Sequence, residues 1–532
     1  MTAPTPARAP SCTALLEGGL WWDADGALRL ENVRIRDLAQ RFGTPLYVVS
    51  EGRLRANARA FRQAFESRWP EGSVRVLPAI KANYGLALRA ILTQEGFGCD
   101  VFSAGELWAA LHCGVPPEQI SLNGNGKLGR DRDVLRTAVA EGVRITLDHK
   151  DEFDAIEGIA RELGRTARIR FRLRPDFPDL LQPSDLVGDL VPTELAINAY
   201  KSGMPTEDVV PLGRRALASD AVELVGVHIH IGRHRRETAF WRSIARGLAA
   251  LLGRLKREWQ GWEPREIDLG GGFAIRRDPT GRGIDRSGLA STALVTGLCR
   301  LAAPFGAAAS HRVMRAALGL QRRWLKDWAA ENPTADLGPT VDDYAVALLE
   351  VLRAELRRHG LEPAGKEIQI EPGRALYGDA GIHITRVNFV KAQREPVPWR
   401  WVNVDTSDAF LVDGSLEHSV FRFVTAAHPP GSASAAETMI ADVVGSSCNA
   451  DRILADVALP RATRAGDLLV LLDTGAYQDA GASNFNALGR PATVLVNGEE
   501  AEVVRAAETP EDVFRRDRVP ERLRGALRSK AQ

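Results

Sequence analysis

Short apolar runs alternate with longer segments of helical periodicity along the first two thirds of the chain. The runs rich in Val, Ile, Leu and Phe predict β-strands, and they lie at residues 47–49, 74–77, 144–147, 169–173, 225–231 and 266–269. Between several of them, as in residues 105–111 and 238–252, apolar side chains recur at the spacing of an amphipathic helix. This alternation predicts a parallel β/α architecture.

The pattern changes beyond residue 385. Apolar runs separated by Gly, Pro and Asp favour an antiparallel β domain, and they lie at residues 387–390, 401–404, 468–472 and 492–496. The interval 280–345 also departs from the alternation. Its residues 311–328 are apolar at helical spacing with a basic opposite face, which predicts an inserted helical element. A lid, a partner surface, a dimer extension and a solvated decoration all fit such an insertion.

Composition narrows the class of protein. The chain has 532 residues, 45% of them hydrophobic, which suffices for two domains or more. A formal net charge of +1 gives no basic field for nucleic acid or an acidic membrane. The five cysteines are scattered without a C-x-x-C pair, which suits a reducing cytoplasm. No apolar run is long enough to span a bilayer, and the N-terminus lacks the apolar core of a signal peptide.

Lys81 is the first candidate for chemistry. The basic residues of this chain are mostly arginine, yet a lysine follows the apolar stretch 74–80. Arginine stays protonated in proteins, whereas a desolvated lysine can lose its proton and form a Schiff base with a carbonyl. A lysine that simply extends from a strand end into solvent is the alternative.

Further polar clusters follow the predicted strands, where the functional residues of a parallel β/α barrel lie. Asp100 could pair with an amine such as Lys81. Ser103 and Glu106 have the spacing of a capping box, which is a sufficient structural reason for both. The turn Glu371-Pro-Gly-Arg374 carries a carboxylate and a guanidinium, and an ion pair within the turn would explain them equally.

Two clusters could bind a ligand directly. In Gly270-Gly-Gly272, backbone N–H groups can approach an anion closely, as phosphate sites require. His228 and His230 share one face of their strand, which fits a metal site or a packed polar pocket. We favour the pocket because the sequence shows no carboxylate near them at ligand spacing. Stacking of an imidazole on an aromatic ring is the third interpretation.

Taken in order along the chain, these pieces resemble the fold type III pyridoxal-phosphate decarboxylases, which act on ornithine, diaminopimelate, arginine and related amino acids. The resemblance runs from residue 42 to residue 486. The motifs that carry it are Lys81-Ala-Asn, Cys99-Asp-Val-Phe-Ser-Ala-Gly-Glu106, Lys201-Ser-Gly-Met204, His228-Ile-His-Ile-Gly232, Asp268-Leu-Gly-Gly-Gly272, Glu371-Pro-Gly-Arg374, Gly445-Ser-Ser-Cys448 and Asp473-Thr-Gly-Ala-Tyr477.

The resemblance implies a (β/α)8 TIM barrel of the alanine-racemase type that binds pyridoxal 5'-phosphate, followed by an antiparallel β domain. We therefore expect residues 1–45 to pack on the C-terminal domain, 46–385 to form the barrel, 386–510 to form the β domain and 511–532 to form a charged helical tail. The resemblance also implies a head-to-tail homodimer in which the partner completes each active site.

The same resemblance implies catalytic roles. Lys81 would hold the cofactor as a Schiff base, and Asp100 would orient that lysine. His230 would stack on the pyridine ring, and Glu371 would bond the ring nitrogen, which makes the ring an electron sink. Cys448 of the second subunit would protonate Cα once CO₂ has left. Read alone, Cys448 would be a small buried hydrophobe.

The phosphate and the substrate would be held by residues of several motifs. The expected cofactor contacts beyond the catalytic residues are Gly232, Arg233, Gly270, Gly271, Gly272, Gly373, Arg374 and Tyr477. Arg374, Tyr477 and Asn449 would also contact the substrate. Arg233 stands where the family usually has serine, and we expect phosphate binding to survive this change.

Two departures concern the substrate. Diaminopimelate decarboxylases carry a glutamate after the cysteine that contacts the far end of the substrate, whereas Asn449 follows Cys448 here. Residues 405–428 also lack the Arg-Pro-x-Leu-Tyr motif that clamps the distal carboxylate in those enzymes. Charged substrate ends without partners are costly in a closed pocket. We therefore expect an amino acid, preferentially an L-amino acid, other than meso-diaminopimelate.

The resulting expectation is a cytoplasmic, pyridoxal-phosphate-dependent amino-acid decarboxylase without a metal. A racemase or epimerase on the same cofactor is the alternative among enzymes, and Cys448 favours decarboxylation over it. A non-catalytic homologue that binds pyridoxal phosphate or a partner enzyme is the alternative outside enzymes. The joint presence of Lys81, Glu371, Tyr477 and Cys448 argues against that alternative.

Overall fold

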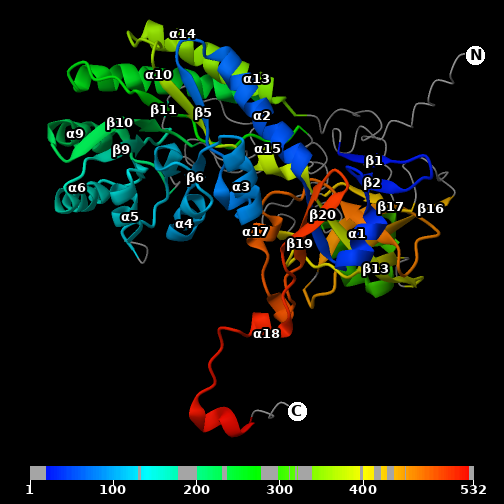
Figure 1. Ribbon diagram of the computed structural model, residues 1–532. Coiled ribbons are helices and arrows are strands. Elements are labelled where there is room, and N and C mark those ends of the chain that lie inside the picture. Colours follow the sequence, from blue (N-terminus) through cyan, green and yellow to red (C-terminus); the bar gives the residue numbers. More distant parts are fainter. Residues whose placement is uncertain are drawn as a thin grey trace, which may run out of the picture.

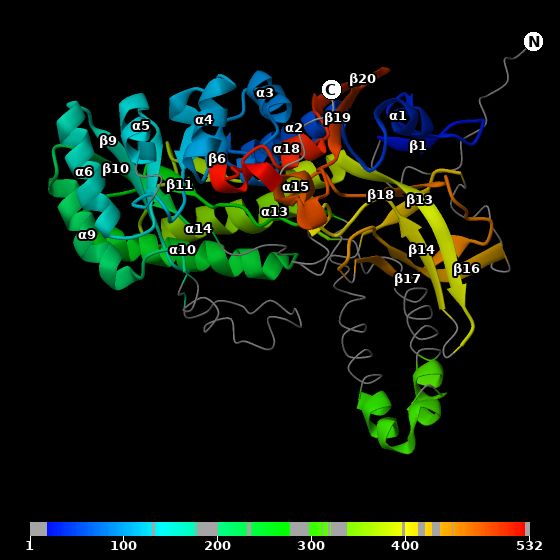
Figure 2. The same ribbon diagram turned by 90° about the horizontal axis from the view of Figure 1, so that it is seen from below.

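The computed structural model describes residues 19–129, 133–175, 177, 201–230, 236–276, 297–310, 312–317, 320, 338–395, 399–412, 421–427, 437–449 and 451–526. In these ranges the chain forms a parallel β/α barrel with a second, sheet-based domain beside it (Figure 1). Figure 2 shows the same two bodies side by side from below. Over this part of the chain, no helix combines the length and the apolarity needed to cross a membrane.

Eight parallel strands form the barrel wall. In sequence order they are β5 (Ser73–Val76), β6 (Cys99–Val101), β7 (Ile120–Leu122), β8 (Arg144–Leu147), β9 (Ala167–Arg172), β10 (Val222–His228), β11 (Glu266–Asp268) and β12 (Glu367–Ile370). β12 pairs with β5 at one end of this order. The ring closes between β5 and β6, where Ala79 pairs in parallel with Asp100. The expected (β/α)8 barrel is therefore confirmed.

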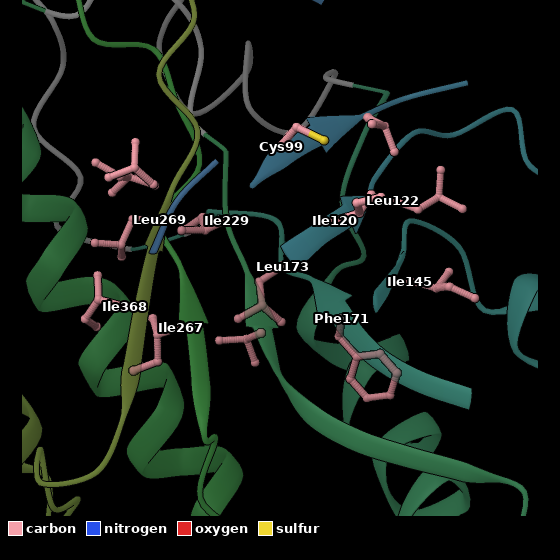
Figure 3. Close-up of a cluster of buried hydrophobic side chains, with 14 of the residues drawn as sticks. Cys99, Ile120, Leu122, Ile145, Phe171, Leu173, Ile229, Ile267, Leu269 and Ile368 are labelled. Carbon is pink, nitrogen blue, oxygen red and sulfur yellow. The ribbon is translucent and has the colours of Figure 1, made fainter. Parts of the chain in front are cut away.

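Helices cover the outside of this wall. They are α2 (Glu51–Arg68), α3 (Leu86–Gln94), α4 (Ala104–His112), α5 (Asp133–Glu141), α6 (Asp151–Leu163), α9 (Thr206–Ala218), α10 (Thr238–Glu258) and the continuous run α13 (Val341–Ala345), η4 (Val346–Glu350) and α14 (Val351–Arg358). Alternation along each strand sends one set of side chains towards the helices. Figure 3 shows members of this buried apolar set, among them Ile145, Phe171, Ile267 and Ile368.

The other face of each strand fills the barrel with polar side chains instead of the branched apolar residues usual in such barrels. Arg144 donates to Glu266 at 2.7 Å near the start of the strands. Arg170 is fully buried one level higher and donates to Asp268 at 2.9 Å. Arg170 also donates to Ser121, Thr146 and Gln369. Ion pairs and hydrogen bonds thus link the interior side chains of one strand to those of the next, although Nε of Arg170 has no hydrogen-bond partner among the described residues.

The second domain is a nine-stranded sheet in which most neighbours are antiparallel. Its strands are β4 (Leu46–Ser50), β13 (Gly381–Gln393), β14 (Trp399–Val404), β15 (Phe423–Thr425), β16 (Thr438–Val444), β17 (Arg452–Pro460), β18 (Leu468–Leu471), β19 (Ala492–Asn497) and β20 (Glu500–Arg505). The pairs β4–β19 and β14–β16 are parallel. The β4 strand, which the sequence boundary at residue 46 assigns to the barrel, lies between β13 and β19 in this sheet.

The N-terminal segment contributes β1 (Leu20–Trp22), β2 (Leu28–Leu30), β3 (Val33–Arg34) and α1 (Ile35–Phe42). Their apolar side chains share one core with residues of the second domain, such as Ile384 and Val470. At the other end, α18 (Pro510–Val513) and η8 (Glu521–Ala526) are short turns in a segment that extends away from the body (Figure 1).

The predicted insertion at 280–345 is described in part, because residues 277–296, 311, 318–319 and 321–337 lie outside the described ranges. Helical residues are present at 297–302, 307–310 and 312–317, and only the last of these stretches falls within 311–328. In Figure 2 this green segment stands away from both domains. Arg315 reaches Glu395 at 3.4 Å, and this exposed pair adds little stability.

The packing of the strands generates a test of the barrel. A Cβ added at Gly226 in β10 would lie 2.0 Å from the carbonyl oxygen of Glu266 in β11, so we expect Gly226→Ala to lower the free energy of unfolding by about 3 kcal/mol. Gly158 in α6 has open space around its added Cβ, and Gly158→Ala should raise stability by about 0.5–1 kcal/mol. Urea unfolding measures both variants, and equal effects would contradict this packing of β10 against β11.

Candidate active site

Lys81 lies at the mouth of the barrel, where the strands end. Beyond β5 the chain keeps bonding to its neighbour, with Leu77 N donating to Ile370 O at 2.8 Å. The short turn η1 (Ile80–Ala82) then presents Lys81 beside Asp100, which lies in β6. The amine of Lys81 donates to Oδ2 of Asp100 in an ion pair. The side chain of Lys81 is 36% exposed and that of Asp100 only 2%. The lysine side chain is therefore accessible, whereas the carboxylate that binds its amine is buried.

Charge keeps this amine protonated. Burial lowers the pKa of Lys81, but the carboxylates of Asp100 and Glu371 outweigh burial and bring the pKa above its ordinary value. A lysine that extends freely into solvent would have no such partner. The sequence analysis suggested that Asp100 could pair with Lys81, and the structure contains this ion pair.

Asn123 is a site residue that the sequence analysis did not find. It follows β7 and is buried, and its Nδ2 donates to Oδ1 of Asp100 and to Oε1 of Glu371, both at 2.6 Å. The same search of strand ends could have identified it. Asn123 was missed because the strand before it, β7, has only three residues and contains no strong apolar run from which it could be predicted.

Glu371 follows β12 and is buried at the centre of the site. Its Oε2 lies 3.4 Å from Nε2 of His228 and 3.9 Å from Nδ1 of His230. Burial, reinforced by the charge of Asp100, raises the pKa of Glu371 to about 7. Burial also lowers the pKa of His228 to about 3 and brings that of His230 well below its usual range. Both imidazoles are therefore neutral beside a carboxylate that titrates near neutrality.

A metal site was one interpretation of the histidines. The fold brings two carboxylates close to His228, which the sequence did not show. Ligand atoms of His228, Asp268 and Glu371 lie within 4.8 Å of one another. Both carboxylates already have donors, since Asp268 accepts from Arg170 and Glu371 accepts from Asn123. This engagement favours the packed polar pocket.

The glycine run after β11 packs tightly against its neighbours. Gly270 and Gly272 have φ of +67° and +101°, a backbone region that favours glycine. Gly270 N donates to Oδ1 of Asp268 at 2.9 Å, and Gly271 N donates to Nδ1 of His230 at 3.1 Å. These two N–H groups are engaged within the protein. The predicted phosphate role of the run therefore falls on Gly272.

The second domain reaches the site through the loop after β18. Tyr477 N donates to Ala82 O at 2.7 Å, beside Lys81. The guanidinium of Arg374 lies over the ring of Tyr477, 4.7 Å from its centroid. A Cβ added at Gly373 would lie 3.0 Å from the hydroxyl of Tyr477. The structure thus brings Gly373, Arg374 and Tyr477 together, whereas Gly232 and Arg233 lie outside the described residues.

Cys448 and Asn449 form a separate group on the loop after β16. Cys448 is exposed, its backbone N donates to Oδ1 of Asn486 at 2.8 Å, and Nδ2 of Asn486 lies 3.2 Å from its Sγ. Asn449 donates to Oδ2 of Asp408 at 2.6 Å. Burial and the nearby Asp451 raise the pKa of Asp408. These hydrogen bonds place Cys448 and Asn449 in a polar loop of the second domain.

The residues present fit pyridoxal phosphate by their chemistry. An aldehyde needs an amine, which Lys81 supplies at an accessible position. A ring nitrogen needs a carboxylate, which Glu371 can supply. Its Oε1 accepts from Asn123, whereas its Oε2 faces the two histidines. A phosphate needs cationic and N–H donors, which Arg374 and Gly272 can provide. These residues would hold the three reactive or charged parts of the cofactor.

Comparisons with known proteins agree with this chemistry. Residues 51–290 match the family model of the pyridoxal-dependent decarboxylase, pyridoxal binding domain. Diaminopimelate decarboxylase of Actinosynnema pretiosum is 31% identical over 511 residues, covering 94% of this chain and 96% of the relative. The enzyme of the same name from Archaeoglobus fulgidus is 29% identical and covers 94% and 99%. The crystal structure of diaminopimelate decarboxylase from M. jannaschii is similar with a TM-score of 0.76 at 25% identity, covering 95% and 98%.

The raised pKa of Glu371 generates a stability test on the cofactor-free protein. Its pKa is about 7 when folded and 4.5 ordinarily, so the folded state retains a proton that the unfolded state has lost between these pH values. The contribution of Glu371 to stability should therefore fall as pH rises through this window, by on the order of 2 kcal/mol. Glu371→Gln should lose this contribution and so gain stability relative to the wild type as pH rises, while Asp268, whose pKa burial raises to about 7, and the neutral histidines His228 and His230, whose contributions have the opposite sign, act alike in both proteins.

Chemical unfolding at pH 5 and pH 8 measures the change. Glu162→Gln removes an exposed carboxylate and serves as the control for loss of charge alone. An unchanged pH dependence in Glu371→Gln would contradict the environment described for Glu371.

Proposed function

The chain belongs to the pyridoxal-dependent decarboxylases and is a pyridoxal-phosphate-dependent amino-acid decarboxylase, and we propose that it acts on an L-amino acid other than meso-diaminopimelate. The observation that carries the chemistry is the continuous set of contacts from Lys81 through Asp100 and Asn123 to Glu371. It presents an amine and a buried carboxylate, held by common partners, at the barrel mouth.

The residues divide the work of the reaction. When bound, pyridoxal phosphate accepts the electron pair that remains on Cα as the carboxylate departs. Lys81 holds the cofactor through its amine, and Asp100 keeps that amine in place. Glu371 holds a proton at the ring nitrogen. The neutral ring of His230 lies beside Glu371, with its Nδ1 3.9 Å from Oε2 of that carboxylate. Arg374 and Tyr477 hold the phosphate and border the substrate.

Cys448 supplies the proton to Cα in this proposal. A thiol can donate a proton and recover it from solvent, and Cys448 is exposed to solvent in the single chain. Its hydrogen bonds run to Asn486 and not to Lys81. We therefore propose that each Cys448 acts in the site of a second copy, in a homodimer with shared active sites. A cytoplasmic location stays a prediction from the cysteine pattern.

The substrate proposal rests on the loop around Cys448. Asn449 is neutral and is held by Asp408, so this loop offers an amide and a carboxylate rather than a cation. A distal carboxylate on the substrate would meet no counter-charge from these two residues, and an unpaired charge in a closed pocket is costly. An amino acid with a neutral or cationic far end fits this loop better. The relatives named diaminopimelate decarboxylase make that compound the decisive comparison.

The first test is release of CO₂ from a panel of L- and D-amino acids that includes diaminopimelate, ornithine, lysine and arginine. We expect one L-amino acid other than meso-diaminopimelate to react. Cys448→Ala should slow turnover by about 100-fold, the range of a lost general acid, with cofactor binding unchanged. Cys113→Ala, a thiol elsewhere in the barrel, should behave as wild type. Preferred turnover of meso-diaminopimelate would refute the substrate proposal, and racemisation without CO₂ would refute decarboxylation.

Borohydride gives an independent test of Lys81. Reduction of the holoenzyme should leave the cofactor covalently attached to the peptide that contains Lys81, as mass spectrometry would show. Lys81→Ala should give no adduct because it lacks the amine. An adduct on another lysine of the wild-type protein would contradict the role given to Lys81.

Mixed dimers test the shared site. Lys81→Ala and Cys448→Ala are each expected to be nearly inactive, but random mixing should restore about a quarter of wild-type activity, since half of the dimers then contain one intact site of two. Activity that stays at the level of the separate variants would show that both residues act within one chain.

A further inference from the structure

Asn123 bridges the two carboxylates of the site through one amide group. Its Nδ2 lies 2.6 Å from Oδ1 of Asp100 and 2.6 Å from Oε1 of Glu371. The opposite orientation of the amide would place its oxygen against two carboxylate oxygens, so repulsion fixes the nitrogen on this side. Ser121 stabilises the same orientation, because its hydroxyl donates to Oδ1 of Asn123 at 3.3 Å.

The backbone holds this amide in place. Asn123 N donates to Val101 O at 2.8 Å, which ties the end of β7 to the end of β6. Asp100 lies in β6 itself, and Glu371 N donates to Gly270 O at 2.8 Å at the end of β12. The donor and its two acceptors thus stand on ordered strand ends. A bridge of this kind requires little side-chain reorganisation.

Each of the two carboxylates contacts Asn123 with one oxygen and its remaining partners with the other oxygen. Asp100 meets Asn123 with Oδ1 and Lys81 with Oδ2. Glu371 meets Asn123 with Oε1, while its Oε2 faces His228 and His230. The bridge therefore holds both carboxylates through one oxygen each, and leaves Oδ2 of Asp100 for Lys81 and Oε2 of Glu371 on the side of the two histidines.

We propose that Asn123 is a positioning residue that couples the carboxylate of the lysine to the carboxylate of the ring nitrogen, so that both stay ionised side by side when pyridoxal phosphate is bound. This inference rests on the proposed function, because it assigns Asp100 and Glu371 their partners on the cofactor. It concerns a residue outside the eight motifs that identified the site. Its chemistry is a neutral double donor between two like charges.

The electrostatics of the pocket favour such a donor. Burial and Asp100 raise the pKa of Glu371, whereas the hydrogen bond from Asn123 is among the influences that lower it. The charged or titratable groups around Glu371, taken from each neighbouring strand end, are Lys81, Asp100, Arg170, His228, His230 and Asp268. Without the amide, Glu371 would take up a proton at a higher pH and would no longer hold the ring nitrogen as an ion pair.

The test compares Asn123→Ala and Asn123→Asp with Asn125→Ala in holoenzyme prepared with pyridoxal phosphate. Asn125 lies on the same loop but donates to Ser202 instead, at 3.3 Å, and is the matched control. Asn123→Ala should weaken cofactor affinity about tenfold, as expected for one hydrogen bond to a charged group. When the visible absorbance of the bound cofactor is titrated with pH, the midpoint of the transition on the acid side should rise by about one pH unit. Asn123→Asp, which substitutes a third acid for the donor, should move it further.

Each outcome decides between alternatives. Wild-type affinity and an unchanged pH titration in Asn123→Ala would overturn the inference, as would equal shifts in Asn125→Ala. A lower melting temperature without a pH shift would indicate a merely structural role and also overturn it. If Asn123→Ala does not fold, Asn123→Ser retains one donor and should give an intermediate shift.

These measurements use pyridoxal phosphate alone and need no amino acid. A wild-type protein that binds the cofactor but releases no CO₂ would refute the proposed function and leave the Asn123 result standing. A wild-type protein that binds no cofactor would refute both.

Discussion

The charges inside the barrel have to be neutralised within the ring of strands, because water cannot reach most of them and an unpaired buried charge is costly. At the lower levels each carboxylate has a guanidinium, as in Arg144 with Glu266 and Arg170 with Asp268. At the mouth the balance is incomplete. Asp100 and Glu371 share one lysine and one neutral amide. A cationic ring nitrogen is the charge that would complete it, and under the proposed function the cofactor would bind as the upper layer of this stack.

The sequence predicted those features of the fold that a local pattern determines. Strong apolar runs located β5, β8, β9, β10 and β11. The short strands β6 and β7 carry three residues each and were not identified as strands. The membership of β4 in the second sheet depends on partners more than 300 residues away, and no local pattern could specify it.

Site prediction shows the same division. Lys81, Asp100 and Glu371 were found because strand ends carry function in parallel barrels and because ordered motifs supported them. Asn123 has no such motif, and its importance appears only when two distant carboxylates converge on it. The glycine run was predicted to bring its N–H groups close to an anion. Two of its N–H groups, however, serve Asp268 and His230, a distinction that spacing alone cannot make.

The position of β4 has a consequence for how the protein is made. This strand leaves the ribosome before any of the barrel, yet both of its partners, β13 and β19, come more than 300 residues later. The residues of β4 therefore leave the ribosome long before their partners, and the second domain can complete its sheet only after β19 has been synthesised. Tyr477, whose backbone N donates to Ala82 O beside Lys81, is synthesised between β18 and β19. The site is thus assembled only after the whole barrel has been synthesised, and in a protein cut between its two domains the second sheet would lose β4, the strand between β13 and β19.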